Sequence, residues 1–589
     1  MSTSRTAAKR GRNRQAPEVR AVEEAATSEV PLALSIALEH PTLSNSPQVL
    51  CAAARSCEAW RQAVQRCAVC NTEVVLEPER LLQRLGSFAQ WLPKHAALVE
   101  AISVMAEQAD WGGGQALAPH HEAAQQLLQR ALQAAAGRAD AGAAAALPAG
   151  SNAGATSSTQ QQQQQQQQLP QLNWRLTSFT SNLPEAPALL CVLPACSLTH
   201  LHLELQSCGA AARASAELSQ LVRLRGLREL HLRGQHYASL PEGFCLSSIG
   251  QLSQLTALDL MGSWSGISKQ LPALLGQALP LRALQVQVRD IDDIAIVLPS
   301  LAHLTQLTML ISRSPLPSAA GASVLPAQLQ ALCLVKCKDL APVLALSQLQ
   351  RLTLCPDFAE RQRVLELVQL PALQELHLDY RFAGLATVTA GYARMWAQLP
   401  QLRGLSLDEG KGPSSAAILA GAAAATQLTN LDLKLTAYPT PVLQSDFMPL
   451  CGSLTALGGL EALSLDANWL VPGDALALTA LTGLTRLVLT DLRAAVGKSA
   501  ATALARSLKQ LELLHLEKCS ANLGSAAFLA AVGQLKKLSY LGLKGNGGLT
   551  QQGLMQLTGL SRLQQLEVDK GEKPTDKDLG RFWAAVRRQ

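Results

Sequence analysis

The amino-acid sequence predicts an α/β solenoid, in which short parallel strands alternate with helical return segments. Three observations support this fold class. The pattern LxxLxL recurs in fifteen copies, with first leucines from Leu198 to Leu563, and three of the copies have valine or serine in place of the last leucine. Successive copies start 20 to 32 residues apart, with a mean of about 26. The segments between copies, such as 499–510 and 525–534, carry apolar residues at helical spacing.

Each copy is expected to supply one strand, with the leucines at positions one, four and six pointing inward. A single repeat cannot bury these leucines, whereas stacked neighbours form a continuous core. We therefore expect parallel strands on a concave face, with the return helices outside. The copies start at Leu198, Leu227, Leu255, Leu281, Leu307, Leu329, Leu349, Leu373, Leu402, Leu428, Leu460, Leu484, Leu511, Leu538 and Leu563.

This pattern resembles the leucine-rich repeat family over about two thirds of the chain. The ninth position of a copy supports the resemblance, because it is Cys337, Asn468, Cys519 or Asn546 in four of them. In the family, an asparagine or cysteine at this point turns the chain from strand to loop by bonding neighbouring backbone. The resemblance therefore implies that these four residues are structural turn residues.

Composition excludes several classes of function. The net charge of the 589-residue chain is +6, and the first twenty residues account for +5 of it, so the remainder is near neutral and does not favour nucleic acid. No apolar run is long enough to span a bilayer, and no signal peptide is evident. Thirteen scattered cysteines, an odd number, fit a reducing compartment. We expect an intracellular protein, cytoplasmic by preference, with cytoskeleton, ciliary axoneme and nucleus left open.

Four regions follow from composition along the chain. Residues 1–29 form a basic tail expected to be disordered, and residues 172–589 form the solenoid with its C-terminal cap. Residues 30–108 are predicted as a helical segment and N-terminal cap, with an early strand at 97–105. Residues 109–171 are a low-complexity insert or linker with nine consecutive glutamines, although its alanine-rich part is compatible with a helix. Residues 174–182 are a further degenerate repeat.

The segment 30–61 resembles an F-box. Val30 and Pro31 stand at its start, and Trp60 and Arg61 at its end. Members of that family bind the Skp-type adaptor of cullin ubiquitin ligases and often precede leucine-rich repeats that hold the substrate. The resemblance implies that the adaptor would be contacted by Pro31, Leu34, Leu38, Leu50, Cys57, Trp60 and Arg61. The segment departs from the family at Leu32 and Ala33, where an acidic residue is usual, and at Ser56, which replaces the aliphatic residue before the cysteine. The alternative is that these helices only cap the open end of the solenoid.

Two other features of the sequence suggest a phosphate-binding or metal-binding site. Gly497, Lys498 and Ser499 resemble the end of a phosphate-binding loop, but Leu492 stands where that loop needs a glycine. Histidines recur at the exposed fifth position of four copies, as His202, His231, His377 and His515. The trio His200, His202 and His231 could bind a metal or sense pH, and the alternative is a polar lining. We therefore predict no catalytic residues, no cofactor and no metal.

A solenoid offers a long preformed surface, which suits protein binding better than catalysis. On the copies from Leu373 to Leu460 the exposed strand positions are mainly acidic, a pattern that favours a basic partner. The residues are Glu375, Asp379, Tyr380, Asp408, Glu409, Asp432 and Asp466. The function predicted is a non-enzymatic substrate-recruiting adaptor of a cullin ubiquitin ligase. The alternative is a cytoskeletal or ciliary scaffold.

Overall fold

A computed structural model shows how these segments fold. It describes residues 72–76, 81–96, 99–106, 118–144, 174–183, 185–205, 216–234, 246–262, 267–287, 299–312, 325–337, 340–356, 358–379, 395–409, 415–435, 451–466, 473–491, 496–519, 523–546, 548–569 and 575–588, with Ala52, Ser56 and Val297. The chain divides into two compact units, Met1–Trp264 and Ser265–Gln589.

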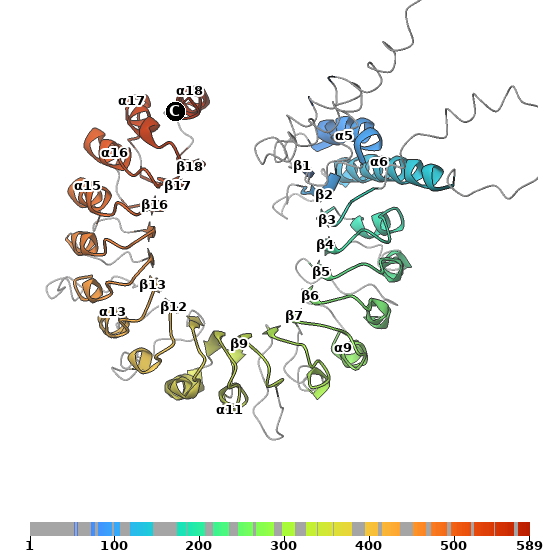
Figure 1. Cartoon of the computed structure of the whole chain (residues 1–589), viewed down its shortest axis with the longest axis horizontal. Coiled ribbons are helices and arrows are strands. Elements are labelled where there is room, and N and C mark those ends of the chain that lie inside the picture. The colour runs from blue at the N-terminus through green and yellow to red at the C-terminus, as the bar shows by residue number, and fades with distance from the viewer. Residues whose placement is uncertain are drawn as a thin grey trace, which may run out of the picture. The chain divides into compact units, whose positions relative to one another are not determined.

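The N-terminal unit is a parallel sheet with helices on one side (Figure 1). Its strands pair in chain order, each with the next along the sequence. They are β1 (Thr72–Leu76), β2 (Val99–Val104), β3 (Ser178–Ser181), β4 (His200–Leu205), β5 (Glu229–Gly234) and β6 (Ala257–Met261). The helices are α5 (Leu81–His95) and α6 (Ala118–Ala144), and the 3-10 helices are η2 (Ala186–Cys191), η3 (Ser219–Arg223) and η4 (Leu246–Gln251).

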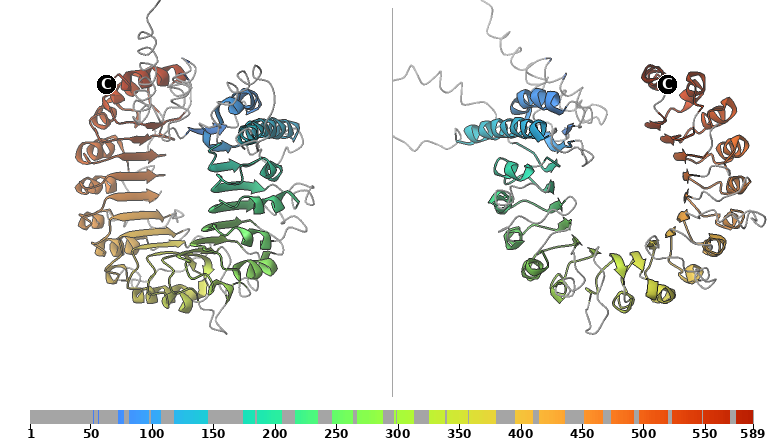
Figure 2. Two further views of the ribbon diagram at one scale, coloured as in Figure 1. Left: turned by 45° about the vertical axis from the view of Figure 1, so that its right-hand side comes forward. Right: turned by 180° about the vertical axis from the view of Figure 1, so that it is seen from behind.

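The C-terminal unit repeats the same arrangement, and its strands also pair in chain order (Figure 2). Its strands are β7 (Ala283–Val286), β8 (Met309–Ser312), β9 (Ala331–Cys337), β10 (Arg351–Pro356), β11 (Glu375–Asp379), β12 (Gly404–Glu409), β13 (Asn430–Leu435), β14 (Ala462–Asp466), β15 (Arg486–Thr490), β16 (Leu513–Glu517), β17 (Tyr540–Gly542) and β18 (Gln565–Glu567).

The return segments of this unit are short α- or 3-10 helices. The α-helices are α9 (Ile267–Leu275), α11 (Ala341–Leu344), α13 (Ser415–Ala424), α14 (Asp474–Ala477), α15 (Lys498–Ser507), α16 (Ala526–Val532), α17 (Gln551–Met555) and α18 (Asp576–Val586). The 3-10 helices are η5 (Phe358–Gln369), η6 (Trp396–Gln398), η7 (Ser453–Ala456), η8 (Leu478–Ala480) and η9 (Gln556–Gly559). A 3-10 helix rises more per residue than an α-helix, so it spans the return path with fewer residues.

All fifteen copies of LxxLxL form strands, and each strand begins two residues after the first leucine of its copy. The parallel register aligns equivalent leucines, as in Leu487, Leu514 and Leu541. These three side chains are at most 2% exposed. The predicted α/β solenoid, with its leucines forming the core between the strands and the return segments, is confirmed.

A hydroxyl group adds a second connection between repeats. Threonine or serine at the second position of a copy donates a hydrogen bond to the backbone carbonyl at the second position of the preceding copy. The bonds measure 3.0–3.3 Å and join Thr199 to Thr177, Thr256 to Arg228, Thr308 to Arg282, Thr429 to Arg403, Thr485 to Glu461 and Ser539 to Glu512. The recurrence of "LT" in the sequence is explained by this contact.

The repeats in the structure begin before Leu198, where the first LxxLxL copy starts. Strands β2 and β3 lie in the two segments expected to hold early repeats, and β1 precedes them with α5 as a complete α-helical return segment. Helix α6 lies inside the region 109–171, for which composition indicated an insert or linker. The reason is the spacing of Ala124, Leu128, Ala131 and Ala135, which are at most 2% exposed and give the helix one buried stripe.

The last helix, α18, covers the end of the C-terminal unit and packs on α17 and η9. Its first turn carries a capping box, in which Thr575 accepts a bond from the Asp578 backbone and Asp578 accepts one from the Thr575 backbone. On its inner face Phe582 is fully buried and Val586 is 6% exposed. An amphipathic helix of this kind shields the open edge of the core from water.

Candidate functional site

The candidate site lies on the exposed strand face of the C-terminal unit, over β10 to β15. The side chains there come from positions three, five and seven of each copy, because alternate residues of a strand point to the same side. Positions three and five line a hollow with a volume of about 500 Å³. Such a volume falls within the range of roughly 300–1,000 Å³ found for ligand pockets.

Small residues create the hollow. On β12 and β14 the third and fifth positions are Gly404, Ser406, Ala462 and Ser464, which leave space above the sheet. Larger side chains stand at the two ends. Arg351 lines it on β10, and Arg486 with Val488 lines it on β15. The strand face is therefore recessed where these four small residues lie between two arginines.

A row of hydrogen bonds crosses the floor of this hollow at position five. His377 Nδ1 lies 2.6 Å from Ser406 Oγ, and Ser406 Oγ donates to Asp432 Oδ2 at 3.1 Å. A carboxylate only accepts, so the single hydroxyl proton of Ser406 is directed at Asp432. Ser406 must then accept from His377 Nδ1–H, which fixes the tautomer and leaves Nε2 as an acceptor.

This order of groups differs from that of a serine nucleophile. In a catalytic triad the histidine accepts the serine proton, whereas here the serine proton goes to Asp432 and the histidine is a donor. Burial lowers the pKa of His377, and the nearby Asp379 only partly opposes this effect. The imidazole is therefore neutral near pH 7, and the row is a fixed polar floor.

Acidic side chains gather at position seven, where the same strands end. Asp379 is in register with Asp408, Asp408 with Lys434, and Lys434 with Asp466. Asp408 is only 8% exposed. Burial, followed by repulsion from Asp491, raises the pKa of Asp466, and the carboxylates of Asp408 and Asp432 act in the same direction. The strand ends thus carry an excess of negative charge.

The structure brings together five of the seven residues predicted for this face. Glu375, Asp379, Asp408, Asp432 and Asp466 lie on four adjacent strands, β11 to β14. Glu409 ends β12, and its side chain lies outside the described part of the chain, as does Tyr380. The hollow, Ser406 and the two arginines were not predicted from the sequence. An alignment of the fifth positions of neighbouring copies would have placed Ser406 between His377 and Asp432.

The residues of the F-box-like segment lie outside the described residues, so their predicted contacts stay predictions. They are Pro31, Leu34, Leu38, Leu50, Cys57, Trp60 and Arg61. The turn residue Asn468 also lies outside the described part of the chain.

The histidines of the N-terminal unit form a separate cluster. The rings of His202 and His231 stack with centroids 5.6 Å apart. Asp259, which is 3% exposed, accepts from Arg233 at 3.1 Å and lies 3.2 Å from His231 Nδ1. Burial, followed by the charges of Arg233 and His231, lowers the pKa of His202. Among the described residues, no group of three or more His, Cys, Asp or Glu side chains could hold a metal ion.

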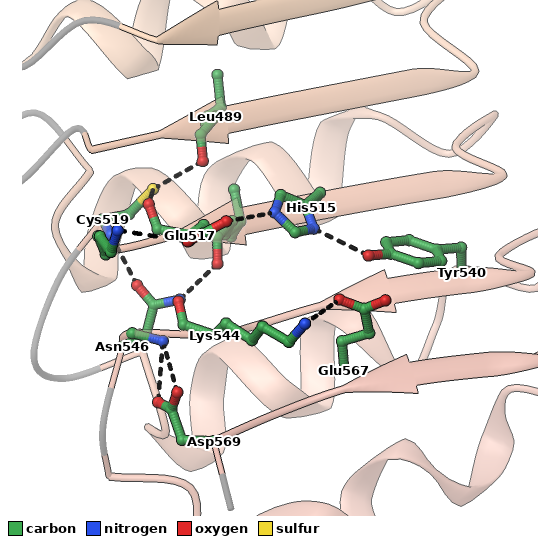
Figure 3. A network of polar contacts seen from close by, with 12 residues as sticks. Leu489, His515, Glu517, Cys519, Tyr540, Lys544, Asn546, Glu567 and Asp569 are labelled. Carbon is green, nitrogen blue, oxygen red and sulfur yellow. Dashed lines mark hydrogen bonds and ion pairs between the residues drawn. The ribbon is translucent and has the colours of Figure 1, made fainter. Parts of the chain in front are cut away.

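The turn residues at the C-terminal end lie in one polar network (Figure 3). Asn546 Oδ1 accepts from the Cys519 backbone N–H at 2.8 Å, and Asn546 Nδ2 donates to the backbone carbonyls of Leu516 and Lys544. The Cys519 thiol points to the Leu489 carbonyl at 3.2 Å, and Cys337 is fully buried as well. These cysteines occupy the core beside the turns.

A second part of this network links three strands through side chains. His515 lies 3.1 Å from the Tyr540 hydroxyl and 3.2 Å from Glu517 (Figure 3). Lys544 forms an ion pair with Glu567 at 2.7 Å. Burial, together with a hydrogen bond to Glu567, raises the pKa of Tyr540 to about 12. The imidazole fits here because position five of the next strand is Gly542, where any Cβ would collide with the ring of His515.

No helix in the described part of the chain is both long enough and apolar enough to cross a membrane.

Comparisons with known proteins identify no family. No family model matches the chain, and no curated protein matches it. Among solved structures it is similar to an internalin from Listeria monocytogenes, with 18% identity and a TM-score of 0.33 over 59% of this chain and 89% of that one. It is also similar to a leucine-rich-repeat protein of Leptospira interrogans, with 18% identity and a TM-score of 0.31 over 69% and 96%. The strand register described above is what makes the chain a leucine-rich-repeat solenoid.

Proposed function

We propose that this protein is a non-catalytic binding module whose strand face on the C-terminal unit holds a protein partner. The observation that carries the proposal is the recessed face over β10 to β15, with an excess of carboxylates at the strand ends. A preformed face on stacked strands loses little freedom when a partner binds. Its charge favours a basic segment of the partner and speeds the encounter with it.

The electrostatics favour a cationic partner for a specific reason. Burial is the main reason that the pKa of Asp466 is raised, and repulsion from Asp491, Asp408 and Asp432 adds to it in the free protein. A positive group brought to the strand ends would relieve this repulsion. Negative groups would increase it, so the same surface discriminates against acidic partners.

Neutralising two of these carboxylates tests the role of the face. The variant Asp379→Asn with Asp466→Asn is expected to weaken capture of the partner by about tenfold and to make binding less sensitive to salt. The amide at position 466 should not lower stability, because the pKa of this carboxyl is raised on folding and its charged form is disfavoured there. The measurement is quantitative affinity capture of cell proteins by the full chain, at two ionic strengths.

The matched control removes two charges elsewhere. Glu122 on α6 and Glu512 before β16 are both exposed, so Glu122→Gln with Glu512→Gln changes the net charge equally. This control should retain the same captured proteins as the wild type. Equal losses in both variants would show that net charge, and not this face, governs capture, and would contradict the proposal.

The more specific function that we propose is recruitment of the partner to a cullin ubiquitin ligase through the F-box-like segment. Its support is the spacing of Pro31, Cys57, Trp60 and Arg61 in the sequence.

A pull-down with a purified Skp-type adaptor tests this proposal. The full chain should retain the adaptor, and Leu50→Asp or Trp60→Ala should abolish retention, because each would remove an apolar contact from the interface. Leu476→Asp is the matched control, since Leu476 is 44% exposed on α14 and the same change there should have no effect. If the folded wild-type chain fails to retain the adaptor, the cytoskeletal or ciliary scaffold becomes the better account.

A further inference from the structure

We propose that the hollow over β11 to β14 receives an arginine or lysine side chain of the partner, held by Asp432 and His377. This inference rests on the proposed binding function and specifies the chemistry of its central contact. It follows from the hydrogen-bond directions on the floor of the hollow, from one unpaired carboxylate oxygen, and from the charge around the hollow.

The floor offers acceptors at two points. The Ser406 hydroxyl proton is committed to Asp432 Oδ2, so His377 Nδ1 donates to Ser406 and His377 Nε2 is left with its lone pair. Asp432 Oδ1 is buried and has no hydrogen-bond partner among the described residues. An unpaired buried carboxylate oxygen is unfavourable, and a donor supplied by a partner would remove that cost.

The surrounding charge selects a positive donor over a neutral one. Asp408 and Asp466 lie at the ends of the two strands that flank Asp432, and Asp466 experiences the negative charge of Asp432 directly. Arg351 and Arg486 lie at position three, near the strand starts and outermost in the hollow. A cationic side chain entering from the strand-end side would pass Asp408 and Asp466, between which Lys434 lies at position seven of β13, and it would stay clear of the two arginines.

The space fits one long side chain between the strands. The hollow has a volume of about 500 Å³, and its centre is bounded by Gly404, Ser406, Ala462 and Ser464. An arginine or lysine has an apolar stem that can pass over such short side chains while its charged end reaches Asp432. Arginine is the better fit of the two, because a guanidinium presents several N–H donors in one plane to a carboxylate.

The test measures binding of labelled peptides to the full chain by fluorescence anisotropy at low salt. The probe is a flexible glycine and serine peptide carrying three arginines, compared with the same peptide carrying citrulline, which has a similar shape and no charge. We expect the arginine peptide to bind at least about tenfold more tightly than the citrulline peptide, because a charge-assisted contact is lost in the latter.

Two variants locate the contact. Asp432→Asn is expected to weaken binding of the arginine peptide by about tenfold. Ala462→Trp keeps the charge and fills the hollow, so it should weaken binding to a similar extent. The control is Glu229→Gln, which removes one negative charge from the strand face of the N-terminal unit and should change affinity by less than about twofold. Circular dichroism and thermal melting confirm that each variant is folded.

The outcomes separate this inference from the proposed function. If Asp432→Asn and Glu229→Gln weaken peptide binding equally, or if a folded Ala462→Trp variant binds like the wild type, the hollow is not the site. The strand-face proposal would then still be judged by capture of the partner with Asp379→Asn and Asp466→Asn. If the arginine peptide does not bind the wild type while partner capture depends on those two residues, the inference fails and the proposed function stands.

Discussion

Leu514→Ala is expected to destabilise the C-terminal unit by about 2–5 kcal/mol, as comparable truncations in protein cores do. Leu514 lies at position four of its copy, is 2% exposed, and is in register with Leu487 and Leu541. Removing its side chain leaves a cavity between two repeats. Neighbouring backbone cannot close that cavity, because strand pairing on both sides fixes its position.

The loss should be local as well as large. In a stack of repeats each unit contacts only its neighbours, so stability depends on the interface between adjacent repeats. We expect amide hydrogens in β15, β16 and β17 to exchange faster in the variant, while those of the N-terminal unit keep their rates. Urea unfolding monitored by circular dichroism measures the change in the free energy of unfolding. Hydrogen exchange with mass spectrometry shows which strands are destabilised.

Leu476→Ala is the matched control for this prediction. It is the same chemical change at a side chain that is 44% exposed on α14, where truncation leaves no cavity. Its effect should stay within about 0.5 kcal/mol, as for other surface substitutions. A Leu514→Ala variant that unfolds at the same urea concentration as Leu476→Ala would show that the inter-repeat core does not depend on this position.

The strands of the solenoid could be predicted from the sequence because their signal is local and repeated. Each LxxLxL copy indicates which residues face the core. Equivalent positions of neighbouring copies pair with one another, so the fifteen copies also indicate the register of the strands. Strand β1, with the sequence TEVVL, lacks this pattern and was missed. It forms because β2 pairs with it in parallel, a contact between segments that carry no shared motif.

The candidate site was predictable in part, for a related reason. Five of the acidic residues could be placed on one face from the strand pattern alone, because Glu375 is at position three, Asp432 at position five and the other aspartates at position seven of their copies. The row from His377 through Ser406 to Asp432 joins residues 29 and 26 positions apart, so it exists only once three repeats are in register. The hollow also depends on the absence of large side chains at Gly404 and Ala462. It was not predicted because a search for sequence patterns finds large or charged residues and passes over small ones.

Asn546→Ala is the second large effect that we expect, with a loss of about 2–5 kcal/mol from the free energy of unfolding. Asn546 is 2% exposed and satisfies three backbone groups of two neighbouring repeats (Figure 3). Alanine would leave the Cys519 N–H and the Leu516 carbonyl buried without this partner. Each unpaired group of this kind costs roughly 1–3 kcal/mol.

Two further variants separate this hydrogen bonding from simple loss of volume. Cys519→Ala removes a buried side chain of the same turn but keeps the backbone N–H that Asn546 binds, so it should cost clearly less. Asn430→Ala makes the same change at an exposed position on β13 and should be nearly neutral. Thermal melting ranks the three variants by stability. Exchange of the Cys519 amide hydrogen should accelerate most in Asn546→Ala. If Cys519→Ala proves as destabilising as Asn546→Ala, the turn is held by packing of the thiol, and the asparagine is not what joins the two repeats.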